Sequence, residues 1–351
     1  MRLELLNAVA DQFLEIEART AVNGGGSVAG NMHILGYDGV MLSAPRAANV
    51  AVLTIAGRVS LALKFDAVGT YYVQSFPANR AADYESVFSQ TLLKITVAGS
   101  TTMATPAWTA ADVTRPYYLL DLTGLASTDA RFETGVDQTG AAATGAGAWL
   151  GVGADCALQC GGRGGNCTVS DLNTYGRCAY MPFNATGIYR FAAPVCSTVE
   201  WTIHGRGATA HPLHLHAHHF QVISFPASGT QATPWGQAGD WRDTWPAISG
   251  RSVVRFRANA YTGALMIHCH YLMHEDLGMM DRIWIGDRTS RACTATSLAA
   301  NCNSAVPLEA FGMEFAAAAP VDCTLPAPPP ASAAHVRFAL AATLTVILCI
   351  L

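Results

Sequence analysis

The sequence is poor in charged residues and has no excess of positive charge. Asp, Glu, Lys and Arg make up 13% of its 351 residues, which is about half of their ordinary share. The formal net charge is −4. Proteins that bind nucleic acids rely on basic patches, so this balance predicts no nucleic-acid partner. The phosphate-binding pattern GxxxxGK is also missing, so the Gly- and Ala-rich segment 139–166 is interpreted as a surface loop.

The sequence also lacks an apolar run of the roughly 20 residues that cross a bilayer as a helix. Residues 338–351 are an uncharged apolar segment after a Pro- and Ala-rich tail at 311–337. Three interpretations stay open for this segment: a signal exchanged for a lipid anchor, a short tail-anchored membrane span, or a buried helix. A signal peptide is missing at the other end of the chain. The apolar stretch that it would need is interrupted by Glu4, Asp11, Glu15 and Glu17.

Ten cysteines contrast with these absences. Eight of them lie in loop-like stretches: Cys156, Cys160, Cys167, Cys178, Cys196, Cys293, Cys302 and Cys323. An even number in such places predicts disulfides formed in an oxidising compartment. Asn166 and Asn184 each begin an N-glycosylation pattern, so we expect a secreted glycoprotein, extracellular or at the cell surface. A zinc site made by the first four of these cysteines is the alternative.

The pattern of the chain predicts an all-β fold. Apolar, β-branched or alternating runs are separated by Gly, Pro and Asn, which is typical of β-sandwiches. We expect strands at residues 50–55, 59–65, 70–75, 92–97, 199–203, 220–225, 252–256, 265–269 and 281–285. The length suits about two domains. We place them at 1–100 and 117–310, joined by a Thr- and Ala-rich linker at 101–116.

A metal-binding pattern stands out near the end of the second domain. Cys269 lies directly between His268 and His270, and His274 and Met279 follow at steps of five residues. In a strand, successive side chains point to opposite faces. We therefore expect Cys269 to face one way and the two neighbouring histidines the other. Thiolate, imidazole and thioether together are the ligand set of a blue-copper electron-transfer site.

A second histidine cluster, at residues 211–219, fits the first one. The period of two places His214 and His216 on one strand face and His211 on the other. Combining both segments predicts two neighbouring metal sites. One consists of His211, Cys269, His274 and Met279, and the other of His214, His216, His268 and His270. The remaining histidines are interpreted as ordinary residues: His33, His204, His218, His219 and His335.

These two segments carry a family resemblance. HPLHLHAHHF and HCHYLMHEDLGMM resemble the two C-terminal copper motifs of the multicopper oxidases, which include laccase, ascorbate oxidase and bilirubin oxidase. The resemblance implies tandem cupredoxin-like (plastocyanin-like) Greek-key β-sandwiches. It also implies copper ligands: His211, Cys269 and His274 at type 1 copper with Met279 as weak axial ligand, His214 at type 2, and His216, His268 and His270 at type 3. Ala217 departs from the family's glycine, and residues 241–244 resemble its structural Arg-Asp-Thr segment.

The resemblance extends to the N-terminal part, where it indicates a gap. Residues 2–8 resemble a strand from the middle of the family's second cupredoxin domain, and residues 34–72 continue that domain, which has no copper ligands. We therefore expect a truncated chain that lacks the first domain. In the family that domain contributes two His-x-His pairs to the three-copper cluster. Half of the cluster's ligands would then have to come from a missing domain or a partner subunit.

Two functions follow from these expectations. The first is laccase-like one-electron oxidation at type 1 copper, with His268, Cys269 and His270 relaying electrons to a cluster that reduces dioxygen in the full-length protein. The alternative is a copper-binding electron-transfer module without oxygen reduction, and the isolated chain is predicted to be inactive towards oxygen. Phenols, bilirubin-like pigments and ferrous or manganous ions all remain possible donors. Glu275 and Asp276 either help to bind such a donor or are solvated loop carboxylates.

Overall fold

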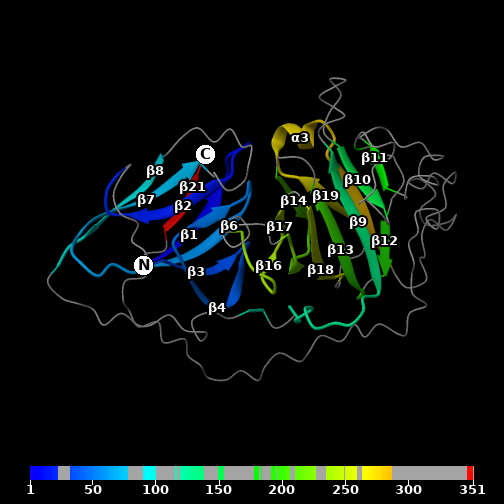
Figure 1. Cartoon of the computed structure of the whole chain (residues 1–351), viewed down its shortest axis with the longest axis horizontal. Helices are drawn as coiled ribbons and strands as arrows, with labels where there is room; N and C mark the ends of the chain where they lie inside the picture. Colours follow the sequence, from blue (N-terminus) through cyan, green and yellow to red (C-terminus); the bar gives the residue numbers. More distant parts are fainter. Residues whose placement is uncertain are drawn as a thin grey trace.

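In the computed structural model, two β-sandwiches lie side by side, and one short helix is the only helix in the described part of the chain (Figure 1). The structure describes residues 1–22, 32–77, 90–99, 115–116, 119–137, 149–153, 178–181, 183, 191–194, 196–205, 210–226, 235–248, 250–258, 263–286 and 346–350. This architecture confirms the predicted all-β fold.

The first sandwich contains a five-stranded sheet in the order β21-β1-β6-β3-β4 and a four-stranded sheet in the order β5-β2-β7-β8. Its strands are β1 (Arg2–Asn7), β2 (Leu14–Arg19), β3 (Met32–Tyr37), β4 (Val40–Ala48), β5 (Ala51–Leu53), β6 (Arg58–Leu63), β7 (Gly69–Pro77), β8 (Gln90–Val97) and β21 (Val346–Ile350). Side chains alternate between the core and the outside along β1. Leu5, Leu61 and Ile16 join the two sheets in one buried cluster.

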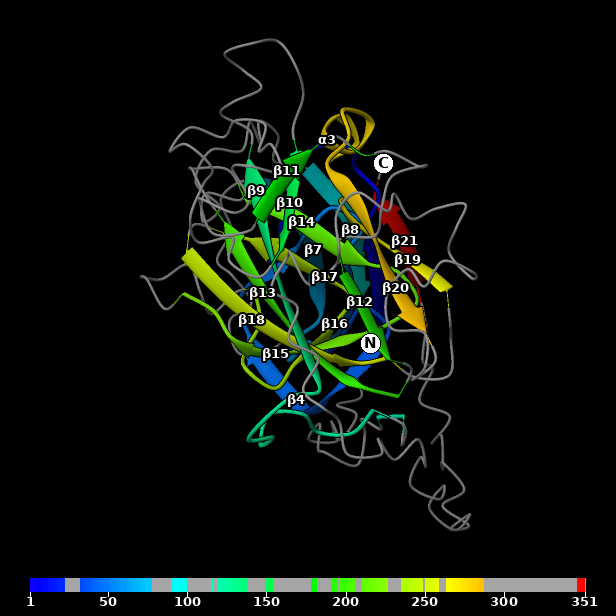
Figure 2. The ribbon, with the colours of Figure 1, turned by 90° about the vertical axis from the view of Figure 1, so that its right-hand side faces the viewer.

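The second sandwich contains a seven-stranded sheet in the order β11-β10-β9-β13-β18-β15-β16 and a five-stranded sheet in the order β12-β20-β19-β14-β17. Its strands are β9 (Ala130–Asp137), β10 (Trp149–Gly153), β11 (Cys178–Met181), β12 (Phe191–Pro194), β13 (Thr198–Gly205), β14 (His211–Leu215), β15 (Phe220–Ser224), β16 (Trp241–Arg242), β17 (Thr244–Ala247), β18 (Gly250–Arg257), β19 (Gly263–Cys269) and β20 (Met280–Gly286). The helix, α3 (Leu272–Asp276), lies at one end of these strands (Figure 2).

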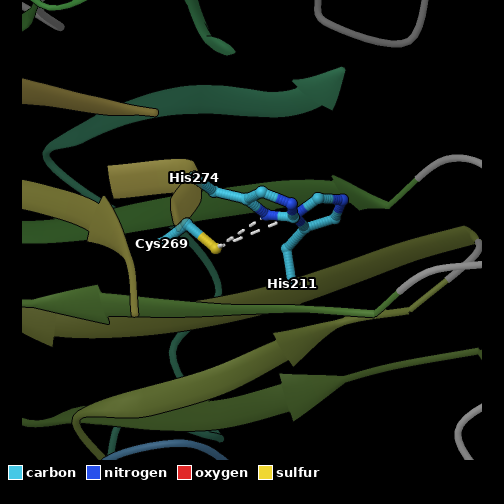
Figure 3. Close-up of side chains that lie close together, drawn as sticks. All are labelled: His211, Cys269 and His274. Atoms are coloured by element: carbon cyan, nitrogen blue, oxygen red, sulfur yellow. Dashed lines mark hydrogen bonds between the residues drawn. The ribbon is translucent and has the colours of Figure 1, made fainter. Parts of the chain in front are cut away.

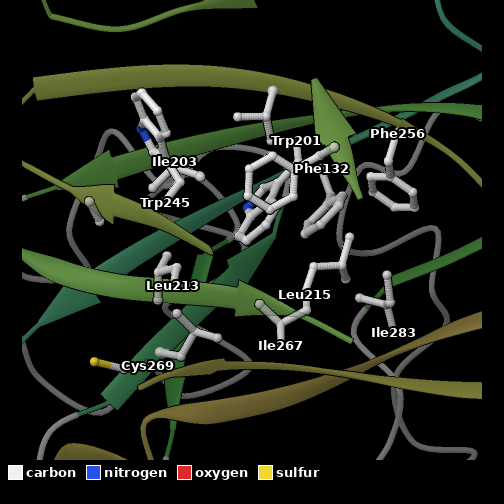
Figure 4. Close-up of a cluster of buried hydrophobic side chains, with 14 of the residues drawn as sticks. Phe132, Trp201, Ile203, Leu213, Leu215, Trp245, Phe256, Ile267, Cys269 and Ile283 are labelled. Carbon is white, nitrogen blue, oxygen red and sulfur yellow. The ribbon is translucent and has the colours of Figure 1, made fainter. Parts of the chain in front are cut away.

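The core of the second sandwich is built around aromatic rings from the larger sheet. The ring planes of Phe132 and Trp201 are stacked with centroids 5.7 Å apart, and both residues are buried against Leu215 and Ile267 of the smaller sheet. Figure 4 shows this cluster with Cys269 at its edge. Burial of large aromatic side chains dominates core energetics, so this cluster fixes the strands that carry the metal-binding pattern.

The nine strands predicted from sequence all occur, with ends that differ by a few residues. Their residue patterns are local, because alternation within one strand decides which face is buried. The domain boundaries at 1–100, 101–116 and 117–310 stay a prediction. The linker is described only at residues 115–116, and the 139–166 loop only at 149–153. The 311–337 tail lies outside the described residues.

The C-terminal apolar segment differs from its prediction. Residues 346–350 form β21, which pairs in parallel with β1 from Leu3↔Val346 to Asn7↔Ile350. The helix interpretation is therefore wrong for these five residues. Their β-branched side chains at 346, 347 and 350 favour a strand. The described residues include no helix long and apolar enough to cross a membrane.

Three arginine–aspartate pairs connect the two sandwiches. The buried Arg242 donates from Nε to Asp38 Oδ2 at 2.8 Å, and both side chains are almost completely buried. Arg46 binds Asp240 through both terminal nitrogens at 2.9 and 2.6 Å. Arg58, the first residue of β6, binds both carboxylate oxygens of Asp243. The edge of the second sandwich near β16 and β17 is thus held against the first one (Figure 1).

Candidate metal centre

A thiol and two imidazoles meet inside the second sandwich. Cys269 Sγ lies 3.7 Å from His211 Nδ1 and 3.8 Å from His274 Nδ1 (Figure 3). The three residues come from the end of β19, the start of β14 and α3. All three are buried, and their ligand atoms lie within 4.8 Å of one another. The sequence prediction brought together the same three residues.

Local structure explains why these residues converge. β14 and β19 are antiparallel neighbours in which Leu213 faces Cys269 and His214 faces His268. Directly opposite residues share a face of the sheet, and His211 shares the face of Leu213 by the period of two. The side of the sheet that carries Cys269 therefore also carries His211.

The segment after β19 folds back beneath Cys269. Gly278 follows the helix with a φ of 99°, a left-handed conformation typical of a glycine that ends a helix. This turn lets Met279 donate its N–H to the carbonyl of His274 at 2.8 Å and accept an N–H bond from Cys269 at 3.0 Å. Met279 is fully buried, as an axial ligand would be. The next residue, Met280, is half-buried.

The donor set fits a metal ion with trigonal ligands. Bonds of about 2.3 Å to sulfur and 2.0 Å to nitrogen, as found in zinc sites, separate the two ligand atoms by about 3.7 Å at a trigonal angle. The observed separations of 3.7 and 3.8 Å agree with this value. Sulfur and imidazole with a buried methionine nearby favour copper over zinc, because such trigonal sites are typical of blue-copper proteins.

Burial keeps both imidazoles in the metal-binding form. Desolvation lowers the pKa of His211 to about 3 and that of His274 to about 4, so both rings are neutral at physiological pH. Burial likewise raises the pKa of the Cys269 thiol well above its usual range. A bound metal ion reverses that effect, since a coordinating thiol is deprotonated outright. The pocket therefore stabilises a thiolate only together with a cation.

Four further histidines gather on the opposite face of the same strands. Their ring centroids lie 4.5 to 5.5 Å apart in five pairs among His214, His216, His268 and His270. The Nε2 atoms of His216 and His268 are 3.0 Å apart. Desolvation lowers the pKa of His268 to about 4 and that of His270 to about 3. This imidazole group is the second site that the sequence predicted.

The two groups differ in exposure. His268 is buried, His214 and His270 are half-buried, and His216 is exposed. Glu275 is half-buried beside them, with Oε2 at 3.3 Å from His268 Nδ1, and it completes a possible ligand group with His268 and His270. Burial raises the pKa of this carboxyl. Glu275 thus lies in α3 and is half-buried beside the histidines, whereas Asp276 is exposed.

The hydrogen bonds of His214 and His268 leave their Nε2 atoms for a metal. His214 Nδ1 donates to the carbonyl of Asp243 at 2.9 Å and lies 3.1 Å from Thr244 Oγ1. His268 Nδ1 lies 3.2 Å from the carbonyl oxygen of Cys269. A carbonyl accepts only, so Nδ1 carries the proton and Nε2 presents a lone pair, which in His268 faces Nε2 of His216 at 3.0 Å. Metal-binding histidines in general hold their other ring N–H in this way.

Asp243 connects His214 to the first sandwich, and no sequence pattern predicted this link. Burial alone would raise the pKa of the Asp243 carboxyl. Hydrogen bonds from His214 and Arg58 outweigh that effect and hold the pKa well below its usual range. The contact between Arg58 and Asp243 spans 185 positions of the chain. Only the resemblance of residues 241–244 to a structural segment pointed to this region.

The other histidines take no part in either group among the described residues. His204 Nε2 lies 2.7 Å from a carboxylate oxygen of Glu133, and His219 Nε2 bonds to the carbonyl of Asp38 at 2.8 Å. The His218 ring is stacked on Phe256, and His33 is half-buried in β3. His335 lies outside the described residues.

Other sequence predictions fall mostly outside the described residues. That holds for both glycosylation patterns and for Cys156, Cys160, Cys167, Cys293, Cys302 and Cys323. Cys178 is described only as part of β11. Cys196 is disulfide-bonded, and Cys269 is free and buried. The full disulfide set and the zinc alternative remain predictions.

Ala217 follows the imidazole pair of β14 with a φ of 60°. An L-residue in this left-handed region costs roughly 1–2 kcal/mol, which explains why a glycine is expected at this turn. The alanine therefore occupies this position in a strained backbone conformation.

Comparison with known proteins gives matches in one family. Residues 170–288 match the family model described as multicopper oxidase. A laccase of Haloferax volcanii is 35% identical over 85 residues, which are 24% of this chain and 14% of the relative. A bilirubin oxidase of Albifimbria verrucaria is 32% identical over 89 residues, 25% of this chain and 16% of the relative.

Solved structures share the fold over most of the chain. A multicopper oxidase from Campylobacter jejuni, described as a metallo-oxidase, matches with a TM-score of 0.54 at 17% identity over 82% of this chain and 53% of its own. A laccase-like multicopper oxidase from Ochrobactrum sp. matches with a TM-score of 0.56 at 17% identity, over 81% and 55%. The chain thus spans about half the length of these structures and a smaller part of the curated relatives.

Proposed function

We propose that this chain, which belongs to the multicopper oxidase family through residues 170–288, is a copper-dependent oxidoreductase that takes single electrons from a reducing donor. The observation that carries the proposal is the buried group of His211, Cys269 and His274, with sulfur–nitrogen separations of 3.7 and 3.8 Å. Copper held there as type 1 copper would accept and release one electron. Met279 would be its weak axial ligand.

The protein itself contributes exclusion of water and a fixed ligand geometry. His211, Cys269, His274 and Met279 are at most 2% exposed, so no donor reaches the ligand atoms directly. The stacked ring of Tyr271, with its centroid 4.5 Å from that of His274, holds this imidazole in place. Tyr271 also donates its N–H to Cys269 Sγ at 3.4 Å, which supports negative charge on the sulfur.

The surface above this group favours an organic donor. α3 and the residue after it present Leu272, Met273 and Leu277 to solvent with 51%, 59% and 46% exposure. Apolar side chains of this kind suit an aromatic donor such as a phenol. A hydrated ferrous or manganous ion would prefer oxygen ligands. We therefore propose phenol-like donors for this protein.

The imidazole group supports a second part of the proposal, the reduction of dioxygen in the whole protein. His268 and His270 flank Cys269 at the end of β19, so a covalent path of one residue joins the two groups. His214, His216, His268 and His270 would hold type 2 and type 3 copper together with imidazoles from a further domain or a partner subunit. Glu275, with Oε2 at 3.3 Å from His268 Nδ1, would hold a proton beside this group.

The alternative is an electron-transfer module that reduces no oxygen. The exposure of His216 favours this alternative for the isolated chain. A ligand group that is open on one side holds metal weakly, because no preformed cage offsets the cost of ordering the ligands. His204 is paired with Glu133 and cannot serve as a replacement ligand without breaking that contact.

The test is spectroscopy and copper quantification on the chain of 351 residues. We expect close to one tightly held copper, an intense visible band and oxygen uptake at background with a phenolic donor. Cys269→Ser should abolish the band, because the chromophore is the copper–thiolate bond. His204→Gln, a histidine outside both groups, is the matched control and should change neither the band nor the copper content.

Two results would contradict the proposal in different ways. A visible band that survives Cys269→Ser would exclude the thiolate site. Strong oxygen uptake that His268→Ala abolishes while the band remains would instead exclude the electron-transfer alternative. The missing ligands would then come from a neighbouring subunit.

A further inference from the structure

The sandwich without candidate metal ligands nevertheless reaches the imidazole group. Arg58 begins β6 of the first sandwich, and its Nη1 donates to Asp243 Oδ1 at 3.0 Å while its Nη2 donates to Oδ2. The carbonyl of Asp243 accepts the Nδ1–H of His214 at 2.9 Å. Asp243 is therefore the only residue between Arg58 and His214 in this chain of hydrogen bonds. The family resemblance assigns His214 to type 2 copper.

The peptide of Asp243 is held from several sides. Its N–H donates to Asp38 Oδ2 at 3.2 Å, and its carbonyl also accepts the N–H of Leu215 at 3.1 Å. The hydroxyl of Thr244 donates to Asp243 Oδ1 at 3.0 Å. With Arg58 engaging both carboxylate oxygens, the side chain has no freedom to turn. The carbonyl then remains directed at the His214 ring.

Without Arg58, the carbonyl oxygen and the carboxylate oxygen Oδ1 of Asp243 would compete for the Nδ1–H of His214. Asp243 Oδ1 lies 3.6 Å from His214 Nδ1, only slightly farther than the carbonyl oxygen. A carboxylate released by the arginine could rotate towards the imidazole, take over its N–H and pull the ring away from the other histidines. A planar guanidinium fork matches a carboxylate at two points, which is what prevents this rotation.

We propose that Arg58 is a positioning residue for His214: through Asp243, it fixes the orientation of this imidazole and directs its Nε2 atom into the group that it forms with His216 and His268. The first sandwich thereby takes part in metal binding without contributing a ligand. This inference rests on the proposed copper-binding role of the imidazole group.

Arg46 offers a matched control. It also crosses between the sandwiches and also binds an aspartate through two nitrogens, Asp240, at 2.9 and 2.6 Å. Asp240 in turn accepts the N–H of Gln237 at 2.8 Å instead of holding a candidate ligand. Arg46→Ala should therefore weaken the contact between the sandwiches as Arg58→Ala does, but leave the imidazole group unchanged.

The first measurement is the tautomer of His214 in the metal-free chain, by long-range proton–nitrogen NMR of its imidazole. We expect the Nδ1–H form in the wild type and in Arg46→Ala. Arg58→Ala should show a mixture of tautomers or a shifted Nδ1 signal, and Arg58→Lys, which keeps the charge but loses the fork, should lie between them. An unchanged His214 signal in a folded Arg58→Ala protein would overturn the inference.

The second measurement is Cu²⁺ titration of the imidazole group in the Cys269→Ser background, followed by electron paramagnetic resonance. Removal of an outer partner of a metal-binding histidine typically costs about 10- to 100-fold in affinity, and we expect a loss of that size for Arg58→Ala alone. Equal losses for Arg58→Ala and Arg46→Ala would mean a general effect of interface stability and contradict the inference. If the parent itself binds no Cu²⁺, the proposed role of the group fails, and the NMR result still decides whether Arg58 positions His214.

Discussion

Removing the charge of Asp38 should destabilise the protein more than any surface substitution. Its carboxylate is fully buried. Oδ2 accepts Arg242 Nε at 2.8 Å and the Asp243 N–H at 3.2 Å, and Oδ1 accepts the Arg58 N–H at 3.0 Å. Asp38→Asn keeps the shape of the side chain. It also tolerates the backbone φ of 50° at this position, because asparagine visits the left-handed region readily.

The expected loss in free energy of unfolding follows from the donors that Asp38→Asn leaves without an acceptor. The asparagine amide has one acceptor oxygen, so either the Arg58 N–H or the pair of donors at Oδ2 loses its acceptor. In addition, the guanidinium of Arg242, itself 1% exposed, keeps its charge without a counter-ion at that contact. Breaking one partner of a buried ion pair costs about 3–5 kcal/mol, and we expect about 3 kcal/mol because part of the hydrogen bonding survives.

The assay is urea unfolding followed by fluorescence, with Lys64→Ala as the control. Lys64 and Asp66 form an exposed ion pair at 3.0 Å, and its loss should cost less than about 1 kcal/mol. The double variant Asp38→Asn with Arg242→Met should recover part of the loss, since no uncompensated charge remains. A cost below about 1 kcal/mol for Asp38→Asn, or no recovery in the double variant, would refute the reasoning.

Three further predictions concern the metal groups. Met279→Leu should keep the visible band in absorption spectra and raise the reduction potential measured by voltammetry, since an axial ligand tunes that potential. Loss of the band in this variant would contradict the role of Met279 as a weak ligand. The metal-free protein should lose at least about 2 kcal/mol of stability between pH 7 and pH 5. Burial lowers the pKa of His211 from 6.5 to about 3 and that of His274 from 6.5 to about 4. The stability that the neutral rings contribute is therefore fully present above pH 6.5 and is lost as the pH falls towards the pKa values of the folded protein. An unchanged urea midpoint between pH 7 and pH 5 would contradict this pH dependence. Ala217→Gly should raise the urea midpoint by relieving strain of about 1 kcal/mol, whereas Ala264→Gly, at an exposed position of β19, should lower stability by about 0.5–1 kcal/mol. Shifts of the same sign would exclude strain at Ala217.

The sequence predicted the parts of the site that depend on local geometry. The period of two along a strand assigns Cys269 to one face and His268 to the other whatever the rest of the chain does. The same argument separates His211 from His214. These assignments agree with the two groups in the structure, although metal binding by them remains to be tested.

Contacts between distant segments could not be predicted in this way. Asp38 and Arg242 are separated by 204 positions, and only the docking of two folded sandwiches brings them together. The link from Arg58 to His214 has the same origin. The strand at 346–350 was missed for another reason, because a short apolar run alone does not distinguish a strand from a buried helix or an anchor.

The contrast in exposure between the two groups has a consequence for how copper arrives and leaves. The Cys269 group is buried, with its candidate ligands at most 2% exposed, and the five-residue helix α3 carries His274, one of these ligands. Local opening of this short segment would expose the group and needs less free energy than global unfolding. We therefore expect slow uptake and slow release under a chelator there, at a rate set by the opening of α3. The imidazole group, with His216 at the surface, should exchange its ions freely, so that a partly loaded protein keeps the deeper ion longest.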